Sequence, residues 1–447
     1  MTLPTPRIDH SYRGLLRVPS LSRVLASMLI ARVAQAMVGV AIVLFTLNEY
    51  DSPALAGVVT LAYILPGILV SPIAGALLDR HGRVRLIVLD YVVAATALGL
   101  IAALSLAGSL PAWLLVLIAG IASLTAILST TGLRSLFPIM VPKHLWERVN
   151  AVDSNGYVVA TILGPPIAAA LVAVVGGPQT LAVIATLMLV ATLPLFRVRD
   201  PAPPKPATAP LLHEAWGGVV YVWRNATLRG LAFSISTLNI AGGVASIAIP
   251  LIVLEQLGFS PTLVGLAFAV SGITGVVSSA FFGRFDTRGR EWRMLVIPMV
   301  LTIPTVALLL PVAASAPAGT AGGIEPLLGI ALVIASQALF GILNGPLDIA
   351  LFTVRQRRTD PAIMGRAFAV SMAANFVGYP LGAAIAGLLA ATSIASAVGL
   401  GVAACVFATV FAAVLIPART PSAPQLATPT FSKSPAPAAS EPVRRQP

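Results

Sequence analysis

The stretch at residues 75–85, GALLDRHGRVR, is a short polar turn between two long apolar runs, 54–77 and 84–106. Each run has about 20 residues, enough for a helix to cross the hydrocarbon core of a bilayer. Inside a bilayer every backbone polar group must bond within its own segment, so such runs form helices. The stretch therefore predicts a helical hairpin whose turn lies at a membrane surface.

Similar apolar runs recur along the whole chain. Of its 447 residues, 57% are hydrophobic and 10% are charged, whereas a soluble domain has roughly 25% charged residues. The predicted fold class is an all-α membrane protein with twelve transmembrane helices. The expected helices are 24–48, 54–77, 84–106, 112–133, 150–174, 179–196, 229–254, 262–283, 294–313, 327–353, 366–390 and 394–416.

The basic residues set the expected orientation. The net charge is +12, yet the connections 49–53, 107–111, 175–179, 255–261, 314–326 and 391–393 contain no Lys or Arg. Every Lys and Arg except Arg32 falls in the other connections, in the terminal segments or at the adjoining helix ends. Enrichment of these residues marks the cytosolic side, so both termini are expected in the cytosol and the chain in the inner (cytoplasmic) membrane. The basic charge thus reports topology and not a nucleic-acid partner.

A linker rich in Pro and Ala, DPAPPKPATAP at 200–210, divides the chain into halves of six helices each. The expected domains are a cytosolic arm (1–23), a first bundle (24–199), a linker (200–228), a second bundle (229–416) and a disordered tail (417–447). After its Pro-rich part the linker is expected to form a helix lying on the membrane surface, with Trp216, Val220 and Trp223 on one face.

The two halves repeat each other, which predicts pseudo-symmetric bundles around a central cavity. DRHGR at 79–83 corresponds to DTRGR at 286–290, and small residues recur at an offset of 214 residues in the fifth and eleventh helices. Small side chains at four-residue spacing let helices approach closely. The positions expected to serve helix packing are Ala160, Gly164, Pro165, Ala168, Gly378 and Gly382.

The stretch at 75–85 resembles the signature of the major facilitator superfamily between its second and third helices. The matching residues are Gly75, Asp79, Arg80, Gly82, Arg83 and Arg85. The resemblance covers essentially the whole chain and implies transport by alternating access between two six-helix bundles. It also implies a cytosolic conformational latch at these six residues and, in the second half, at Asp286, Gly289 and Arg290.

Within that superfamily the chain is most similar to drug:proton antiporters of the macrolide-efflux type. The similar segments are RSLFP at 134–138, NAVD at 150–153 and VWRN at 222–225. The resemblance implies secondary active efflux of a hydrophobic small molecule or drug, driven by proton influx. Two alternatives stay open: uptake or lipid-like flipping by the same fold, and a transport-inactive membrane scaffold or sensor.

Ionisable groups inside apolar helices cost about 2.5–3.5 kcal/mol each on insertion scales and therefore mark candidate sites. Asp348 and Asp153 are the candidates for proton coupling, because all four histidines lie in cytosolic segments. Asp153 and Asp90 lie near the cytosol, where a salt bridge or a capping role is also expected. Arg32 lies deep in the first helix and is the leading candidate for a substrate contact.

The remaining polar residues of the expected cavity are few: Gln35, Asn239, Asn344 and Asn375. A mainly apolar pocket with few polar anchors suits a lipophilic small molecule. No metal-binding pattern and no Gly-x-x-x-x-Gly-Lys-Ser/Thr phosphate loop occurs in the sequence. A non-enzymatic monomer without cofactors is therefore expected, with a lipophilic compound, protons and the lipid bilayer as its partners.

Overall fold

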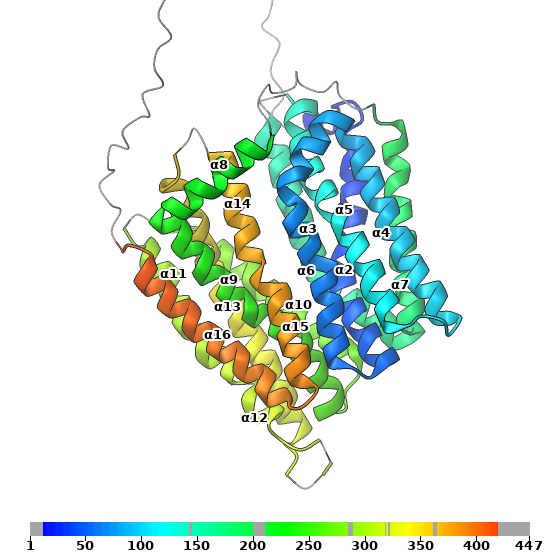
Figure 1. Cartoon of the computed structure of the whole chain (residues 1–447), viewed down its shortest axis with the longest axis vertical. Coiled ribbons are helices and arrows are strands. Elements are labelled where there is room, and N and C mark those ends of the chain that lie inside the picture. Colours follow the sequence, from blue (N-terminus) through cyan, green and yellow to red (C-terminus); the bar gives the residue numbers. More distant parts are fainter. Residues whose placement is uncertain are drawn as a thin grey trace, which may run out of the picture.

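The computed structural model describes residues 12–142, 145–199, 211–284, 289–317, 319–320, 322–360 and 364–418. These residues are almost entirely helical, and they include 12 helices long and apolar enough to cross a membrane. Figure 1 shows the helices arranged in two bundles that lie side by side. The predicted fold class, an all-α membrane protein, is confirmed.

The first bundle begins with a short helix and then contains the first six spans. Its elements are α1 (Tyr12–Leu16), α2 (Leu21–Tyr50), α3 (Pro53–His81), α4 (Arg83–Leu106), α5 (Ala112–Met140), α6 (Trp146–Val175), α7 (Gly177–Thr192) and a 3-10 turn, η2 (Leu193–Arg197). The sequence beside a helix determines where it begins, as α3 shows. Ser52 caps α3 by accepting from the Leu55 backbone N–H, and Pro53 fills the first helical position, which needs no amide donor.

The second bundle follows the linker. Its elements are α8 (Leu211–Arg224), α9 (Ala226–Leu251), a π-helical turn η3 (Ile252–Gln256), α10 (Pro261–Phe282), α11 (Glu291–Ala307), α12 (Leu310–Ala313), α13 (Pro326–Arg357), α14 (Met364–Phe376), α15 (Gly378–Ala390) and α16 (Ile394–Leu415). Two of the expected helices are interrupted. The ninth is divided into α11 and α12, just after Pro304, and the eleventh into α14 and α15 at Val377.

The helix predicted at the membrane surface is α8, which in Figure 1 crosses the end of the second bundle that is expected in the cytosol. It ends at Arg224, earlier than expected, because Asn225 caps the next helix. The Asn225 side-chain oxygen accepts hydrogen bonds from the backbone N–H groups of Thr227 and Leu228 at 3.0 and 3.1 Å. Helix α9 consequently starts at Ala226 and not at residue 229.

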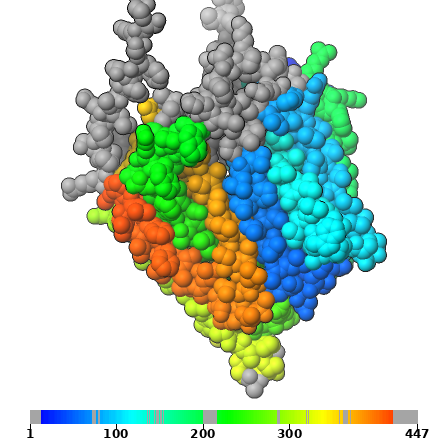
Figure 2. Space-filling view, in the orientation of Figure 1, coloured from blue at the N-terminus to red at the C-terminus, as the bar shows by residue number. Residues whose placement is uncertain are grey.

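The bundles contact each other mainly along two helix pairs, α3 with α15 and α6 with α10. Figure 2 shows the α3–α15 contact as a seam between blue and orange surfaces. In each pair a glycine near the outer end of one helix lets the two backbones touch. A Cβ on Gly57 of α3 would overlap the Ala383 carbonyl oxygen of α15, and a Cβ on Gly265 of α10 would lie 2.6 Å from the Pro166 Cα of α6. The bundles are therefore closed against each other on the outer side by backbone-to-backbone packing.

Candidate functional site

A cavity of about 660 Å³ lies between the two bundles. The first bundle contributes residues of α2 and α6 to its wall, and the second bundle contributes residues of α9, α10, α11, α13, α15 and α16. The lining reaches Ser279 and Asp348 on α10 and α13, toward the helix ends expected in the cytosol, and Pro250 and Val398 on α9 and α16, toward the opposite ends. The cavity therefore occupies the middle of the molecule and is lined along much of the length of the helices.

The cavity wall is mostly apolar and carries aromatic rings from both bundles, Tyr157, Phe268, Phe340 and Tyr379. Among the described residues that line it, Asp348 is the only one with a formally charged side chain. Its side chain is exposed to the cavity. Asn344 lies one helical turn earlier on α13 and also lines the wall. The site therefore combines one acidic group with aromatic and aliphatic surface.

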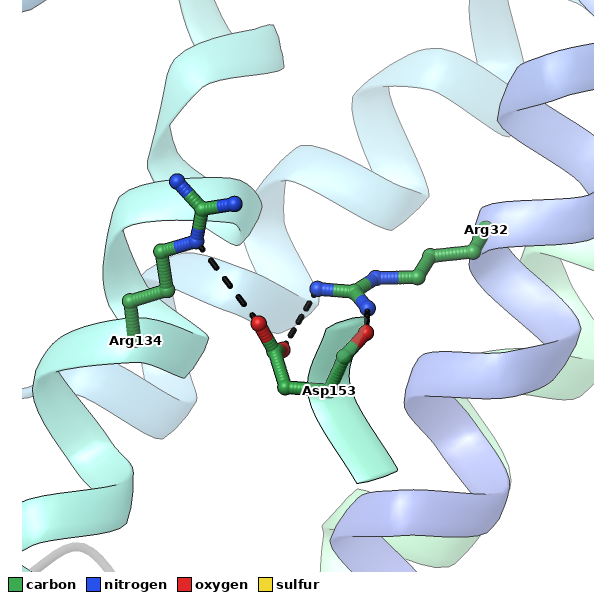
Figure 3. Close-up of polar contacts among 3 residues, drawn as sticks. All are labelled: Arg32, Arg134 and Asp153. Atoms are coloured by element: carbon green, nitrogen blue, oxygen red, sulfur yellow. Dashed lines mark hydrogen bonds and ion pairs between the residues drawn. The ribbon is translucent and has the colours of Figure 1, made fainter. Parts of the chain in front are cut away.

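Arg32 and Asp153 form a buried ion pair inside the first bundle (Figure 3). Each is 7% exposed. The Arg32 Nη2 lies 2.6 Å from the Asp153 Oδ1, and Nη1 donates to the Asp153 backbone carbonyl. The exposed Arg134 approaches from α5, with its Nε 3.8 Å from the other carboxylate oxygen. This triad joins α2, α5 and α6, and its members are outside the set of residues that line the cavity.

The amide candidates divide between the two bundles, and of these only Asn344 lines the cavity. Gln35 donates to the Ser129 hydroxyl at 3.2 Å within the first bundle. Asn239 donates to the backbone carbonyl of Asn375 at 2.9 Å, which ties α9 to α14. These hydrogen bonds join helices of the same bundle.

Two further buried polar groups are Arg355, which the sequence did not indicate, and Asp90, for which a salt bridge or a capping role was expected. Arg355, in the last turn of α13, is 0% exposed. When the Asn375 amide is oriented so that its nitrogen donates to the Ser371 carbonyl, its oxygen accepts a hydrogen bond from Arg355 Nη2 at 2.6 Å. Asp90 is 2% exposed, and among the described residues its Oδ2 has no hydrogen-bond partner. The apolar run of α13 stops before Arg355, so burial of that residue had no sequence signal.

The packing residues lie at close approaches between helices. Ala160 and Ala168 are buried, and a Cβ on Gly164 would lie 2.5 Å from that of Ala36 on α2. In the second bundle, Cβ atoms on Gly378 and Gly382 would overlap the carbonyl oxygens of Ser236 and Ile240 on α9. Pro165 lies within α6 and lines the cavity.

The described part of the candidate latch shows two tight backbone turns. Gly82 separates α3 from α4 with φ 91°, and Gly289 precedes α11 with φ 74°; both values favour glycine. Arg83 is buried, whereas Arg85 and Arg290 are exposed. Asp286 lies outside the described residues. For Gly75, Asp79 and Arg80 the structure describes the helical backbone alone.

Relatives of known sequence include several transporters. The chain is 36% identical over 385 residues to an uncharacterized MFS-type transporter, y4rN, of Sinorhizobium fredii, covering 85% of this chain and 90% of that one. It is 24% identical to the multidrug efflux pump Tap of Mycolicibacterium fortuitum, over 79% and 85% of the two chains. It is 20% identical to macrolide efflux protein A of Streptococcus pyogenes, over 82% and 88%.

Among solved structures, the nucleoside transporter NupG superposes with a TM-score of 0.68 at 13% identity, covering 89% of this chain and 98% of that one. This likeness shows the fold. The family model of the Major Facilitator Superfamily matches residues 24–243 and 231–447, one match for each half. Together with the helices, the two bundles and the relatives, these matches establish that the chain belongs to the major facilitator superfamily of membrane transporters.

Proposed function

We propose that the chain is a secondary active transporter of the inner membrane that exports a lipophilic cation in exchange for protons, by alternating access. The observation that carries the proposal is Asp348, the one formally charged side chain among the described cavity residues. In a site of lowered dielectric a single carboxylate attracts a cation and repels an anion more strongly than it does in water. The aliphatic and aromatic wall suits the apolar body of such a substrate.

Exchange with protons follows if Asp348 serves both ligands in turn. A proton on Asp348 removes the negative charge and with it the attraction for the cation, and departure of the proton restores it. Among the described residues, no hydrogen bond or ion pair holds the Asp348 carboxylate. Asp153, the other carboxylate considered, is held by Arg32 at 2.6 Å. We therefore assign proton exchange to Asp348 and a structural role to the Arg32–Asp153 pair.

The direction of transport is supported by the relatives. Tap is named a multidrug efflux pump, and the streptococcal relative is named a macrolide efflux protein. A small lipophilic compound that is expelled from the cytosol can reach the cavity where its lining includes Ser279, near the end of α10 that is expected on the cytosolic side. The solved neighbour NupG is a nucleoside transporter, so the fold by itself leaves the substrate open and the proposal rests on the cavity wall.

The test is transport of tetraphenylphosphonium, a lipophilic cation, into inverted membrane vesicles with an acidic lumen. We expect the cation to accumulate and lumenal pH to rise, and we expect Asp348→Asn to abolish both. Asp51→Asn is the matched control, since Asp51 lies in the turn between α2 and α3 on the outer side. Movement of cation in the other direction would favour uptake. Movement of labelled lipid in place of the cation would favour a flippase, and movement of neither would favour a non-transporting scaffold.

A further inference from the structure

The face of α8 that points away from the bundle is apolar, although the helix lies at the end expected in the cytosol. Trp216 is 65% exposed, Val219 37% and Trp223 61%. These three residues and Val220 recur at helical spacing and line a groove of about 300 Å³ together with Arg224. Figure 2 shows α8, in green, at the surface of the molecule. Tryptophan side chains with an apolar body and a polar N–H favour the headgroup level of a bilayer.

Aromatic rings continue this surface from α8 onto two membrane-spanning helices. The Trp223 ring lies edge-on to Phe233 of α9, with centroids 5.9 Å apart. Phe233 lies 6.2 Å from Phe411 of α16, and Phe411 lies 6.4 Å from Phe407. Phe233 is 41% exposed and Phe407 58%. This ladder of four rings runs from the membrane surface into the hydrocarbon region, a path that an acyl chain can follow.

Two arginines, Arg224 and Arg229, lie near Trp223, at the end of the ladder closest to the membrane surface. Arg224 occupies the last turn of α8 and is exposed. Arg229, in the first turns of α9, donates from Nη1 to the Trp223 backbone carbonyl at 3.0 Å, which holds its guanidinium beside the end of α8. Among the described residues, neither arginine forms an ion pair with a carboxylate. Their charges are thus free to meet an anion at headgroup depth.

We propose that this surface binds one anionic phospholipid of the cytosolic leaflet. The headgroup phosphate lies between Arg224 and Arg229, and an acyl chain covers the rings of Phe233, Phe411 and Phe407. A zwitterionic lipid offers the same acyl chain but carries a compensating positive charge, which the two arginines repel. The charge of the headgroup therefore decides which lipid occupies the groove. The lipid lies against α8, which packs on α14 and α9 of the second bundle and on α3 of the first.

The proposal is tested with phospholipids whose acyl chains carry bromine, which quenches tryptophan fluorescence on contact. The reporter is a variant that keeps Trp223 and replaces the other four tryptophans, Trp113, Trp146, Trp216 and Trp292, by Phe. We expect brominated phosphatidylglycerol to quench Trp223 at a lower mole fraction than brominated phosphatidylcholine. A basic residue near an anionic membrane surface contributes roughly fivefold in affinity, so the preference should approach about 30-fold for two arginines.

Arg224→Gln combined with Arg229→Gln should remove the preference, and Arg224→Lys, which keeps the charge, should retain it. Arg197→Gln is the matched control, because Arg197 is exposed at the cytosolic end of the first bundle, away from α8. Lipid retention in native mass spectrometry gives the same comparison with all tryptophans present. Equal quenching by the two lipids, or a preference that survives in the double variant, would overturn the proposal and leave ordinary annular lipid on this face.

Discussion

Replacing Asp348 by Asn should weaken binding of a lipophilic cation and strengthen binding of an anion of the same shape. Two unit charges 4 Å apart attract by about 1 kcal/mol in water and about 4 kcal/mol at the dielectric typical of a protein surface. The Asp348 side chain is exposed to the cavity, so water screens part of this attraction and about 1–2.5 kcal/mol is expected. That range corresponds to roughly a 5- to 70-fold loss of affinity.

The assay is equilibrium binding to the purified protein in detergent, with tetraphenylphosphonium and its isosteric anion tetraphenylborate as ligands. The two ions share size, shape and apolar surface, so their difference in affinity isolates the sign of the charge. Asp348→Asn should bring the two affinities together by weakening the first and strengthening the second. If the wild type binds both ions equally, or if Asp348→Asn weakens both to the same extent, the electrostatic account of the cavity is refuted.

Three further outcomes follow from the structure. Exchange of one monovalent cation for one proton at Asp348 moves no net charge across the membrane. Clamping the membrane potential with potassium and valinomycin should therefore leave the transport rate unchanged. If a net charge did move, the driving force would change by about 2.3 kcal/mol per 100 mV, and the rate would change with it. Arg32→Met leaves the buried Asp153 without its close partner and should destabilise the protein by about 3–5 kcal/mol in thermal unfolding. Adding Asp153→Leu to the same chain should restore stability. Unchanged stability in the single variant would contradict the ion pair. Gly57→Ala should loosen the outer closure, because its Cβ would overlap the Ala383 carbonyl oxygen. Ser246 lines the cavity, so a cysteine introduced there reports access to it. An impermeant thiol reagent added from outside should label Ser246→Cys faster in the Gly57→Ala background than in a Gly399→Ala background, because a Cβ at Gly399 would meet nothing within 4 Å. The buried native Cys405 should add little background.

The sequence was sufficient for the fold because the length and apolarity of its runs predict spanning helices, and the linker and the internal repeat predict two bundles. Proline and glycine positions also located the turn at Gly82 and the close approaches at Gly164 and Gly378. The breaks inside spans were harder to predict. Val377 interrupts the eleventh span where Gly378 packs against the backbone of Ser236, and this contact depends on the neighbouring helix, which the local sequence does not contain.

The candidate site was predictable in type but not in arrangement. Membrane depth identified Arg32, Asp153 and Asp348 as costly groups, yet it could not decide which of them face each other. The structure pairs the first two across α2 and α6 and leaves Asp348 on the cavity wall. Such pairing depends on the rotation of each helix about its axis. Rotation is set by packing among spans that are apolar on most faces, so periodicity carries little information about it.

The uneven wall of the cavity has a consequence for how this transporter can acquire new substrates. Six helices of the second bundle line it, against two of the first, among the residues that the structure describes. The second half of the repeat therefore supplies most of the wall that a substrate in this cavity would contact. If the chain exports a lipophilic cation as proposed, a mutant library confined to α9, α10 and α13 should alter the range of compounds it carries while the Arg32–Asp153 pair of the first bundle stays intact. New substrates would then arise by substitutions in one half of the gene.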